Sequence, residues 1–359
     1  MRKTYQFRIY PNKEQRNILL NQLEECRWLY NHLLEQRKVS WETQQLSISL
    51  YTQHKYITEL KDTRIKLKSI HSQVLQDVAT RIDLAYQAFF QRLKNKDKDA
   101  GYPRFKGQDR YDSMTFKQSG FQLTENKLKI SKVGKIKIIQ HRPIKGQIKT
   151  LNIRKNNLNQ WFACFSVELE YKALPKTNKA IGIDVGLETF ATYSDGTKID
   201  NPRYFRKAEE QLTTTQSKYS KHKSKKLKLK LSKLHNKVAN KRKDFCHKLS
   251  RNIVNEYDTI CVEDLNINKM MKNHRMAKSI GDAAWNQFIQ FLIYKAEEAD
   301  KQVIQVNPAY TSQDCSECGY RVAKKLSDRI HNCPNCGLSL DRDINASINI
   351  LRLGTSHSY

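Results

Sequence analysis

The 359-residue chain is short of acidic residues, and this shortage bears directly on its partners. It has 36 Asp and Glu against 65 Lys and Arg, which leaves a formal net charge of +29. A surplus of this size repels itself unless a polyanion neutralises it. The usual polyanions are nucleic acid and anionic membrane, so the composition argues against an ordinary cytosolic enzyme of small molecules.

Long apolar runs are also missing. No stretch approaches the ~18 uninterrupted apolar residues that a membrane-spanning helix needs. The basic residues near the N-terminus, Arg2 and Lys3, are not followed by the apolar run of a signal peptide. We therefore expect a cytoplasmic protein with no membrane partner, which binds nucleic acid. Its length predicts two or three domains.

The N-terminal half combines helices with short strands. Residues 3–9 alternate between polar and apolar side chains, which predicts a strand. Asn12 and Gln15 have the spacing of a helix-capping box. A second helical pattern runs over about 70–93, so residues 11–98 are expected to form a helical lobe.

The pattern changes to short strands between about residues 101 and 171. The alternating positions are Met114 and Phe116, Leu128 and Ile130, Ile136 and Ile138, and the run from Trp161 to Leu169. Several short strands with polar turns predict a small β-barrel. We expect residues 3–9 to join this barrel, which makes the helical lobe an insertion.

The C-terminal half predicts a mixed α/β layer. The expected strands are 179–184, one through Thr192, 259–263 and 303–306, and the expected helices are 282–300 and one from Asn345. This order suits a ribonuclease H-like fold. Twelve Lys or Arg lie between positions 217 and 243, with no acid between Glu210 and Asp244. Because leucines keep an apolar seam through this stretch, we predict one long helix with a basic outer face.

Three acids occupy places where apolar residues would cost less. Asp184 and Glu263 lie in otherwise apolar predicted strands, and Asp343 lies at the entry to the last helix. Three convergent carboxylates can hold two Mg²⁺ ions for phosphodiester hydrolysis. Asp264 competes with Glu263 as ligand, and Asp341 competes with Asp343 both as ligand and as helix cap.

Four of the eight cysteines form two C-x-x-C pairs, separated by fourteen residues: Cys315, Cys318, Cys333 and Cys336. Gly319 and Gly337 follow the pairs, where a tight turn needs a permissive backbone. Four thiolates bind Zn²⁺ tetrahedrally, so the spacing predicts one closed, structural zinc ion in a reducing compartment.

These motifs occur together in a known family. The segments are Gly182–Gly186, Val262–Leu265, the paired C-x-x-C-Gly and Asp341–Ala346, together with Tyr102–Lys106 and Asn307–Ser312. In this order and spacing the chain resembles the TnpB family of transposon-encoded RNA-guided DNA endonucleases, relatives of type V CRISPR effector nucleases. The resemblance covers essentially the whole chain.

The resemblance implies a multidomain α+β protein. Residues 1–10 and 99–175 would form a wedge β-barrel, and 11–98 an inserted helical recognition lobe. Residues 176–310 and 339–359 would form a RuvC-like nuclease domain of ribonuclease H fold, interrupted at 311–338 by a zinc ribbon that binds target nucleic acid. The side-chain carboxylates of the catalytic residues Asp184, Glu263 and Asp343 would bind two Mg²⁺ ions.

The implied partners are a guide RNA transcribed from the transposon end, target double-stranded DNA beside a short adjacent motif, and the displaced strand. The protein would act as a monomer. A guide leaves sequence reading to base pairing, so the protein mainly grips backbones. Candidate contacts are Lys68, Gln73, Tyr102, Arg104, Phe105, Lys106 and Arg329. The alternatives are a guided DNA-binding regulator without cleavage and an unguided transposase.

Overall fold

The structure, a computed structural model, describes residues 2–170, 173–325 and 328–356, and it divides the chain into two compact units, 1–170 and 171–359. The predicted domain ranges also include positions 1, 171–172, 326–327 and 357–359, which lie outside the described residues. In the described part of the chain, no helix is both long enough and apolar enough to cross a membrane.

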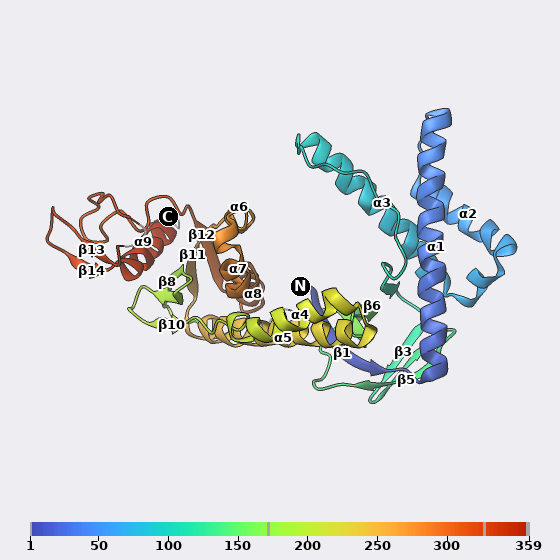
Figure 1. Ribbon diagram of the computed structural model, residues 1–359. Helices are drawn as coiled ribbons and strands as arrows, with labels where there is room; N and C mark the ends of the chain where they lie inside the picture. The colour runs from blue at the N-terminus through green and yellow to red at the C-terminus, as the bar shows by residue number, and fades with distance from the viewer. Residues whose placement is uncertain (1, 171–172, 326–327, 357–359) are drawn as a thin grey trace. The chain divides into compact units, whose positions relative to one another are not determined.

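The first unit is built on a seven-stranded antiparallel sheet (Figure 1). Its strand order is β2-β6-β7-β1-β5-β4-β3, with β1 (Arg2–Tyr10), β2 (Ser113–Phe116), β3 (Phe121–Thr124), β4 (Lys127–Ile130), β5 (Gly134–Ile139), β6 (Gln147–Lys155) and β7 (Trp161–Glu168). Strands β2 and β3 are opposite edges, yet only residues 117–120 connect them. The sheet therefore curls into a nearly closed barrel, which confirms the predicted barrel. Strands β3 and β6 were not predicted.

The helices of this unit are inserted between β1 and β2. They are α1 (Lys13–Gln44), α2 (Leu50–Thr63), the 3₁₀ helix η1 (Ile65–Ser69) and α3 (Ser72–Lys94). The predicted capping box is present, because Asn12 Oδ1 accepts from the Gln15 backbone N–H at 2.8 Å and Gln15 Oε1 accepts from the Asn12 N–H at 3.1 Å. The apolar faces of the helices join the barrel in one core, which includes Phe7, Leu29 and Val78. Helix α2 was missed by the sequence pattern.

The second unit holds a five-stranded mixed sheet of order β10-β9-β8-β11-β12. The strands are β8 (Ala180–Val185), β9 (Thr189–Tyr193), β10 (Lys198–Asp200), β11 (Thr259–Glu263) and β12 (Gln302–Val306). Strands β8, β11 and β12 are parallel to one another, while β9 pairs antiparallel with both β8 and β10. The four predicted strands 179–184, the one through Thr192, 259–263 and 303–306 are present as β8, β9, β11 and β12, and β11 has the predicted bounds.

Helices cover both faces of this sheet. Because successive side chains of a strand point to opposite faces, Ile181 and Ile183 join the core with α5 (Lys225–Glu256) and α8 (Trp285–Glu298). Gly182 instead faces α9 (Arg342–Ser356), which begins three residues before its predicted start. A Cβ on Gly182 would collide with the Ser347 carbonyl, so this glycine lets α9 pack closely on β8.

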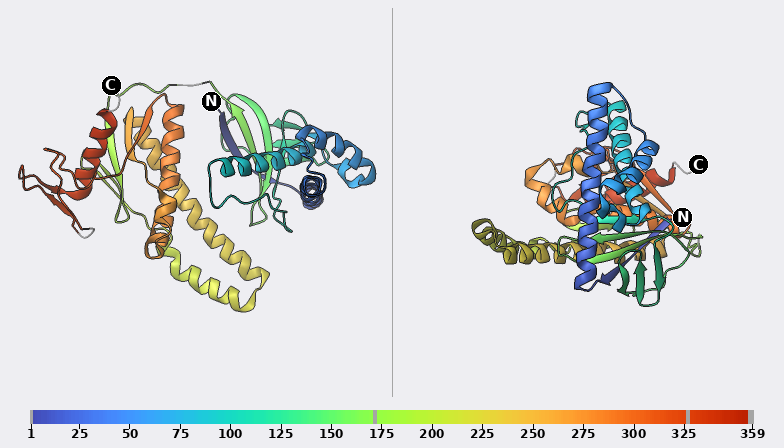
Figure 2. Two further views of the ribbon diagram at one scale, coloured as in Figure 1. Left: turned by 90° about the horizontal axis from the view of Figure 1, so that it is seen from above. Right: turned by 90° about the vertical axis from the view of Figure 1, so that its right-hand side faces the viewer.

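The remaining elements are η2 (Arg206–Ala208), α4 (Glu209–His222), α6 (Ile267–Met270), α7 (His274–Ala283), β13 (Ile330–Asn332) and β14 (Ser339–Asp341). The prediction of a single basic helix around 217–243 is wrong, because α4 and α5 form a helical hairpin (Figure 2). Lys223 adopts φ 45° at the turn, and Ser224 Oγ accepts the Leu227 N–H to cap α5. A left-handed lysine gives no signal in sequence, whereas glycine would have done so.

Candidate active site and metal centre

The parallel strands explain why the three predicted acids meet. Cys261 is in register with Gly182 in the ladder between β11 and β8. Two residues further on, Asp184 is the last residue but one of β8 and Glu263 is the last residue of β11. Both point to the same face as Gly182 and Cys261. That face is covered by α9, and Asp343 lies in the first turn of α9. The fold therefore brings residues 184, 263 and 343 to one edge of the sheet.

All three acids line one cavity of about 860 Å³. Its other acids are held by partners: Glu188 by Arg329 at 2.7 Å, and Glu209 by Lys278 at 3.2 Å. Asp282 accepts the backbone N–H groups of residues 205 and 206. These pairings separate the acids that are already neutralised or engaged from the predicted three.

The predicted acids are less completely satisfied. Glu263 Oε1 accepts the Thr311 hydroxyl at 2.5 Å, and Asp343 Oδ1 lies 3.0 Å from an Arg342 nitrogen. No ion pair is found for Asp184 within the described residues. Burial, followed by the charges of Glu263 and Asp343, raises the pKa of Asp184 to about 8, and burial also raises the pKa of Glu263. Burial and the neighbouring acids therefore make ionisation of Asp184 unfavourable in this corner of the cavity.

The structure separates the neighbouring acids that competed in the sequence. Asp341 Oδ1 accepts the backbone N–H groups of Asp343 and Ile344, so it caps α9, and its other oxygen lies 2.7 Å from Lys198 Nζ. Asp341 and Asp264 are both absent from the cavity lining. Because Asp341 caps the helix, the Asp343 carboxylate is left to face the cavity.

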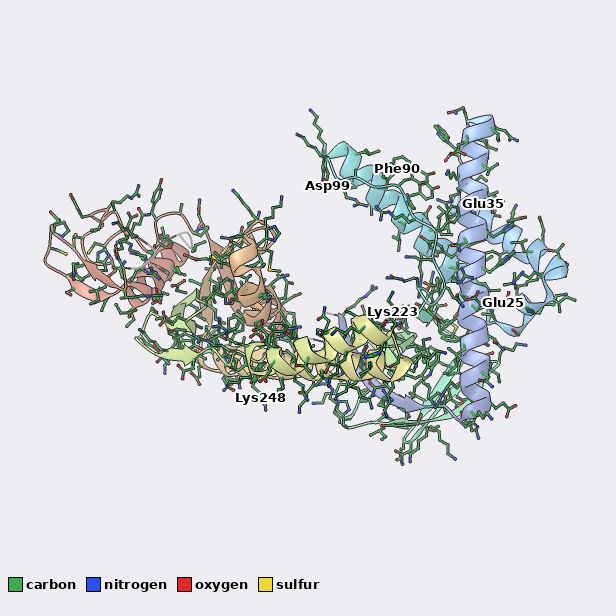
Figure 3. The ribbon with its side chains drawn as sticks, in the orientation of Figure 1. Glu25, Glu35, Phe90, Asp99, Lys223 and Lys248 are labelled. Atoms are coloured by element: carbon green, nitrogen blue, oxygen red, sulfur yellow. The ribbon has the colours of Figure 1, made fainter. Side chains whose placement is uncertain are left out.

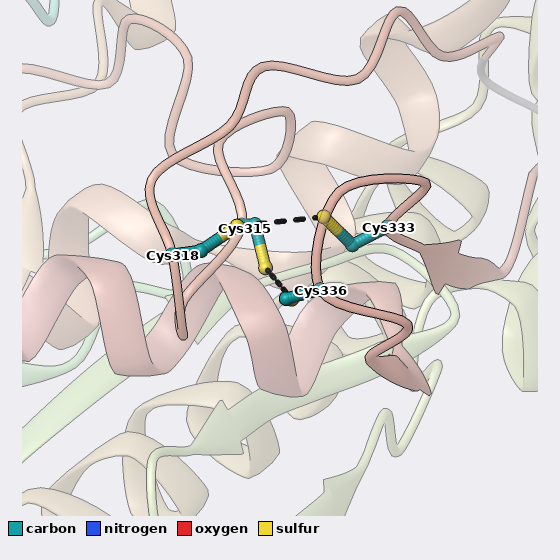
Figure 4. Close-up of side chains that lie close together, drawn as sticks. All are labelled: Cys315, Cys318, Cys333 and Cys336. Carbon is teal, nitrogen blue, oxygen red and sulfur yellow. Dashed lines mark hydrogen bonds between the residues drawn. The ribbon is translucent and has the colours of Figure 1, made fainter.

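The four cysteines form a tighter cluster than the carboxylates do. Their sulfur atoms all lie within 4.8 Å of one another, with 3.6 Å between Cys315 and Cys336 and 3.5 Å between Cys318 and Cys333. Figure 4 shows the side chains pointing toward one another from two loops. Tetrahedral Zn–S bonds of ~2.3 Å would place the sulfurs about 3.8 Å apart. The cluster therefore fits a four-coordinate metal ion.

The two loops have the same hydrogen bonding. The Gly319 N–H donates to the Cys315 carbonyl at 2.9 Å, and the Gly337 N–H donates to the Cys333 carbonyl at 3.0 Å. Both glycines have positive φ, +77° and +76°. The backbone of each loop thus turns tightly after its cysteine pair. A residue with a β-carbon would be strained at these positive φ angles.

Two asparagines that were not singled out from the sequence join the cysteine loops to α9. Asn345 Oδ1 accepts the Ser316 N–H at 2.9 Å, and its amide donates to the Asp314 carbonyl at 2.8 Å. The Asn349 amide donates to the carbonyls of Thr311 and Asp314. Both side chains are buried. The first cysteine loop is therefore fixed to the helix that carries Asp343, a link that only the tertiary structure reveals.

Arg329 is the one nucleic-acid candidate that lines the cavity. It lies between the cysteine pairs, and its side chain is 55% exposed although it pairs with Glu188. Arg203, Arg206 and Arg342 also line the cavity, and the sequence did not single them out. Four arginines thus line the same cavity as the carboxylates.

Two candidates in the first unit have contacts within the protein. Gln73 Oε1 accepts the backbone N–H groups of residues 117, 118 and 119 at 3.1–3.2 Å, so this oxygen holds the loop after β2. Lys68 Nζ lies 3.0 Å from Asp62 Oδ1 on the surface. The oxygen of Gln73 therefore has a structural role, and a base contact by either residue stays a prediction.

The segment around residue 104 is attached to the helices while presenting exposed side chains. The Lys106 carbonyl accepts from Arg27 and Asn31, and its ammonium lies 5.3 Å from the Tyr30 ring centroid. Tyr102 shares a 2.6 Å hydrogen bond with the Tyr86 hydroxyl. Tyr102, Arg104 and Phe105 are all exposed, so a nucleic-acid contact there stays a prediction.

Comparisons with known proteins agree with these features. Residues 164–274 match a family described as "Probable transposase", and residues 285–350, which hold the four cysteines, match one described as "Cas12f1-like, TNB domain". A relative from Streptomyces pristinaespiralis named "Putative RNA-guided DNA endonuclease" is 29% identical over 371 residues, which cover 100% of this chain and 90% of the relative. "TnpB-like protein L79" of Acanthamoeba polyphaga mimivirus is 30% identical over 232 residues, which cover 59% of this chain and 44% of that protein. The chain is therefore similar to the TnpB family, as its motifs predicted.

The comparison with solved structures concerns the fold of this chain. The solved structure of a mini-RNA-guided endonuclease, CRISPR-Cas_phi3, aligns over 99% of this chain and 92% of its own, with a TM-score of 0.51 and 10% identity. Residues 1–45 also match a family described as "Helix-turn-helix domain". In this structure the described part of that stretch forms β1 and the single helix α1, not two helices joined by a turn.

Proposed function

We propose that this chain is a member of the TnpB family and an RNA-guided DNA endonuclease encoded by a transposable element, with one RuvC-like metal site in its second unit. The observation that carries the proposal is the meeting of Asp184, Glu263 and Asp343 at one edge of the sheet, in a cavity bordered by arginines. The names of the relatives support the guided activity, and the +29 charge supports polyanionic partners.

The carboxylates fit Mg²⁺ in their chemistry. They offer hard oxygen ligands, and the pKa of Asp184 is raised first by burial and then by the charges of Glu263 and Asp343, which a divalent cation would offset. Asp184, Glu263 and Asp343 would hold the metal. When bound, Mg²⁺ ions supply activation of water and stabilisation of the leaving oxygen of a phosphodiester.

The chain's own residues prepare this site. The Thr311 hydroxyl fixes one oxygen of Glu263, and Arg342 holds one oxygen of Asp343, so two of the three carboxylates are oriented before a substrate arrives. The Arg329 guanidinium is exposed at the cavity and can exchange Glu188 for a phosphate oxygen. Together these groups would position a DNA strand over the carboxylates.

The cysteine cluster would hold one structural Zn²⁺ ion. Four thiolates leave no open coordination position, so the ion would stabilise a segment with little core of its own. Through Asn345 this stability would extend to the start of α9. We assign the wedge and recognition roles to the first unit, and expect it to contact the guide RNA and the target DNA.

The first experiment expresses the gene with its native flanking DNA, purifies the protein and sequences the RNA that accompanies it. One dominant RNA, with a fixed scaffold that ends in sequence from beyond the element, is expected. That RNA is then used to direct Mg²⁺-dependent cleavage of a matched plasmid, with a mismatched plasmid as control. Random cellular RNA, or equal cutting of both plasmids, would favour an unguided transposase. Guided binding without cutting would favour a regulator.

A further inference from the structure

A short turn leads from β12 to the first cysteine loop and passes beside the carboxylates. We call residues 307–314 the Thr311 turn, after the residue that is buried in it and lines the carboxylate cavity. The Thr311 hydroxyl lies 2.5 Å from Glu263 Oε1 and 3.2 Å from the Pro308 carbonyl oxygen. A hydroxyl has one proton, and the shorter distance is that of a charge-assisted hydrogen bond, so Thr311 donates to Glu263. One predicted metal ligand is therefore held by the segment that enters the cysteine cluster.

The residue before Thr311 adopts a rare backbone conformation. Tyr310 has φ 67°, in the left-handed region that bulky side chains seldom occupy. Such a conformation costs free energy and persists only where the surrounding structure holds it. The N–H groups of Gln313 and Asp314 both donate to the Tyr310 carbonyl at 2.9 Å. The Arg321 guanidinium carbon lies 3.6 Å from the centroid of the Tyr310 ring. Because Arg321 lies between the two cysteine pairs, the cysteine loops help to keep the turn in the shape that presents Thr311.

Helix α9 holds the same turn through Asn349. The amide of this residue donates to the carbonyls of Thr311 at 2.9 Å and Asp314 at 2.7 Å. Asn349 is only 1% exposed, and its side-chain oxygen has no hydrogen-bond partner among the described residues. A buried amide with an unsatisfied oxygen is destabilising by itself, so the contacts of its N–H₂ group are the reason for its position. Side chains fill the space between α9 and the cysteine loops (Figure 3).

We propose that Thr311 is a positioning residue, which holds the Glu263 carboxylate in the orientation that binds a divalent cation, and that Asn349 acts through Thr311. The proposal rests on the proposed function only in that Glu263 is a metal ligand. Groups that hydrogen-bond a metal ligand fix its orientation, and their loss typically lowers metal affinity about 10–100-fold. Since Arg321 and Asn349 hold the turn, the orientation of Glu263 depends on the folded cysteine loops and on α9.

The test measures binding of Mn²⁺, which carboxylates bind as they bind Mg²⁺, to the guide-free full-length protein by the electron paramagnetic resonance of the free ion. Thr311→Val removes the hydroxyl and keeps the shape of the side chain, whereas Thr311→Ser keeps the hydroxyl. Ser312→Ala is the matched control, because Ser312 lines the same cavity and its hydroxyl has no hydrogen bond in the part of the chain that the structure describes. Urea unfolding checks that each variant is folded.

Thr311→Val should weaken Mn²⁺ binding on the order of 10-fold or more, while Thr311→Ser and Ser312→Ala should stay within about threefold of the wild type. Asn349→Ala should also weaken binding. Added to Thr311→Val it should lower the affinity by less than about twofold more, because the two changes remove one route to Glu263. Unchanged affinity in Thr311→Val, an equal loss in Thr311→Ser, or additive losses in the double variant would overturn the proposal.

Asp184→Asn, measured in the same way, separates this proposal from the proposed function. If Asp184→Asn binds Mn²⁺ as tightly as the wild type, the carboxylates are not the metal site and both proposals fail. If Asp184→Asn loses the binding while Thr311→Val retains it in full, the metal site stands and only the role of Thr311 is refuted.

Discussion

Replacing Asp184 by asparagine should stabilise the metal-free protein at neutral pH. An unfolded Asp has a pKa near 3.9, whereas burial, with the charges of Glu263 and Asp343, raises the pKa of folded Asp184 to about 8. Between these values the folded state binds the proton more tightly than the unfolded state does. The stabilising effect of the protonated group is therefore complete below about pH 4 and is lost progressively as the pH rises toward 8.

The size of the effect follows from the shift. One pKa unit corresponds to 1.36 kcal/mol, and about three units separate pH 7 from the unfolded pKa. The shifted carboxyl therefore costs up to about 4 kcal/mol at pH 7, a cost that the neutral amide of similar shape avoids. We expect Asp184→Asn to raise the free energy of unfolding by about 2–4 kcal/mol at pH 7 and by under about 1 kcal/mol at pH 4.

Urea unfolding in magnesium-free buffer measures these free energies of unfolding. The buffer contains no chelator, because a chelator would also remove zinc. Asp264→Asn, one residue beyond Glu263 and exposed, is the matched control and should change stability by under about 0.5 kcal/mol. Added Mg²⁺ should stabilise the wild type and have little effect on Asp184→Asn. The reasoning is refuted if Asp184→Asn is less stable than the wild type at pH 7, or if its effect is the same at both pH values.

Three further changes test other parts of the account. Gly182→Ala should lower the free energy of unfolding by about 3 kcal/mol or more, because the added Cβ would collide with the backbone of α9. The control Gly281→Ala, whose Cβ would have one neighbour at 3.8 Å, should leave the melting temperature unchanged or raise it slightly. Cys333→Ser should lower bound zinc well below one ion per chain and expose 311–341 to protease, measured by mass spectrometry and limited proteolysis; full zinc content would contradict the ligand assignment. Asn345→Ala should leave the Ser316 N–H without its partner, while the Asp314 carbonyl keeps the Asn349 amide. The change should lower the free energy of unfolding by about 1–3 kcal/mol and accelerate zinc loss to a chelator, and an unchanged rate would argue against the link to α9.

Patterns of apolar residues predicted most of the strands. Alternation over residues 161–169 predicted β7, and the short apolar run of residues 260–262 between Thr259 and Glu263 predicted the bounds of β11. The cysteine spacing likewise predicted a cluster that the distances support. Such features follow from local geometry, which the sequence encodes directly.

The features that could not be predicted depend on long-range contacts or on rare backbone states. Nothing local distinguishes Asp341 from Asp343, since the cap is decided by how β14 leads into α9. The partner of Arg329 lies 141 positions earlier in the chain. Lys223 breaks the basic segment by adopting a left-handed conformation that lysine seldom takes.

The most direct test of the central claim compares two aspartates two positions apart in guided cleavage. Asp343→Asn and Asp341→Asn are each purified with the same guide RNA and incubated with a matched DNA target and Mg²⁺. The account predicts that Asp343→Asn binds the target but does not cut it, while Asp341→Asn, with a weakened cap on α9 and no pair for Lys198, still cuts. Cleavage by Asp343→Asn, or its loss only in Asp341→Asn, would contradict the assignment of the metal-binding carboxylates.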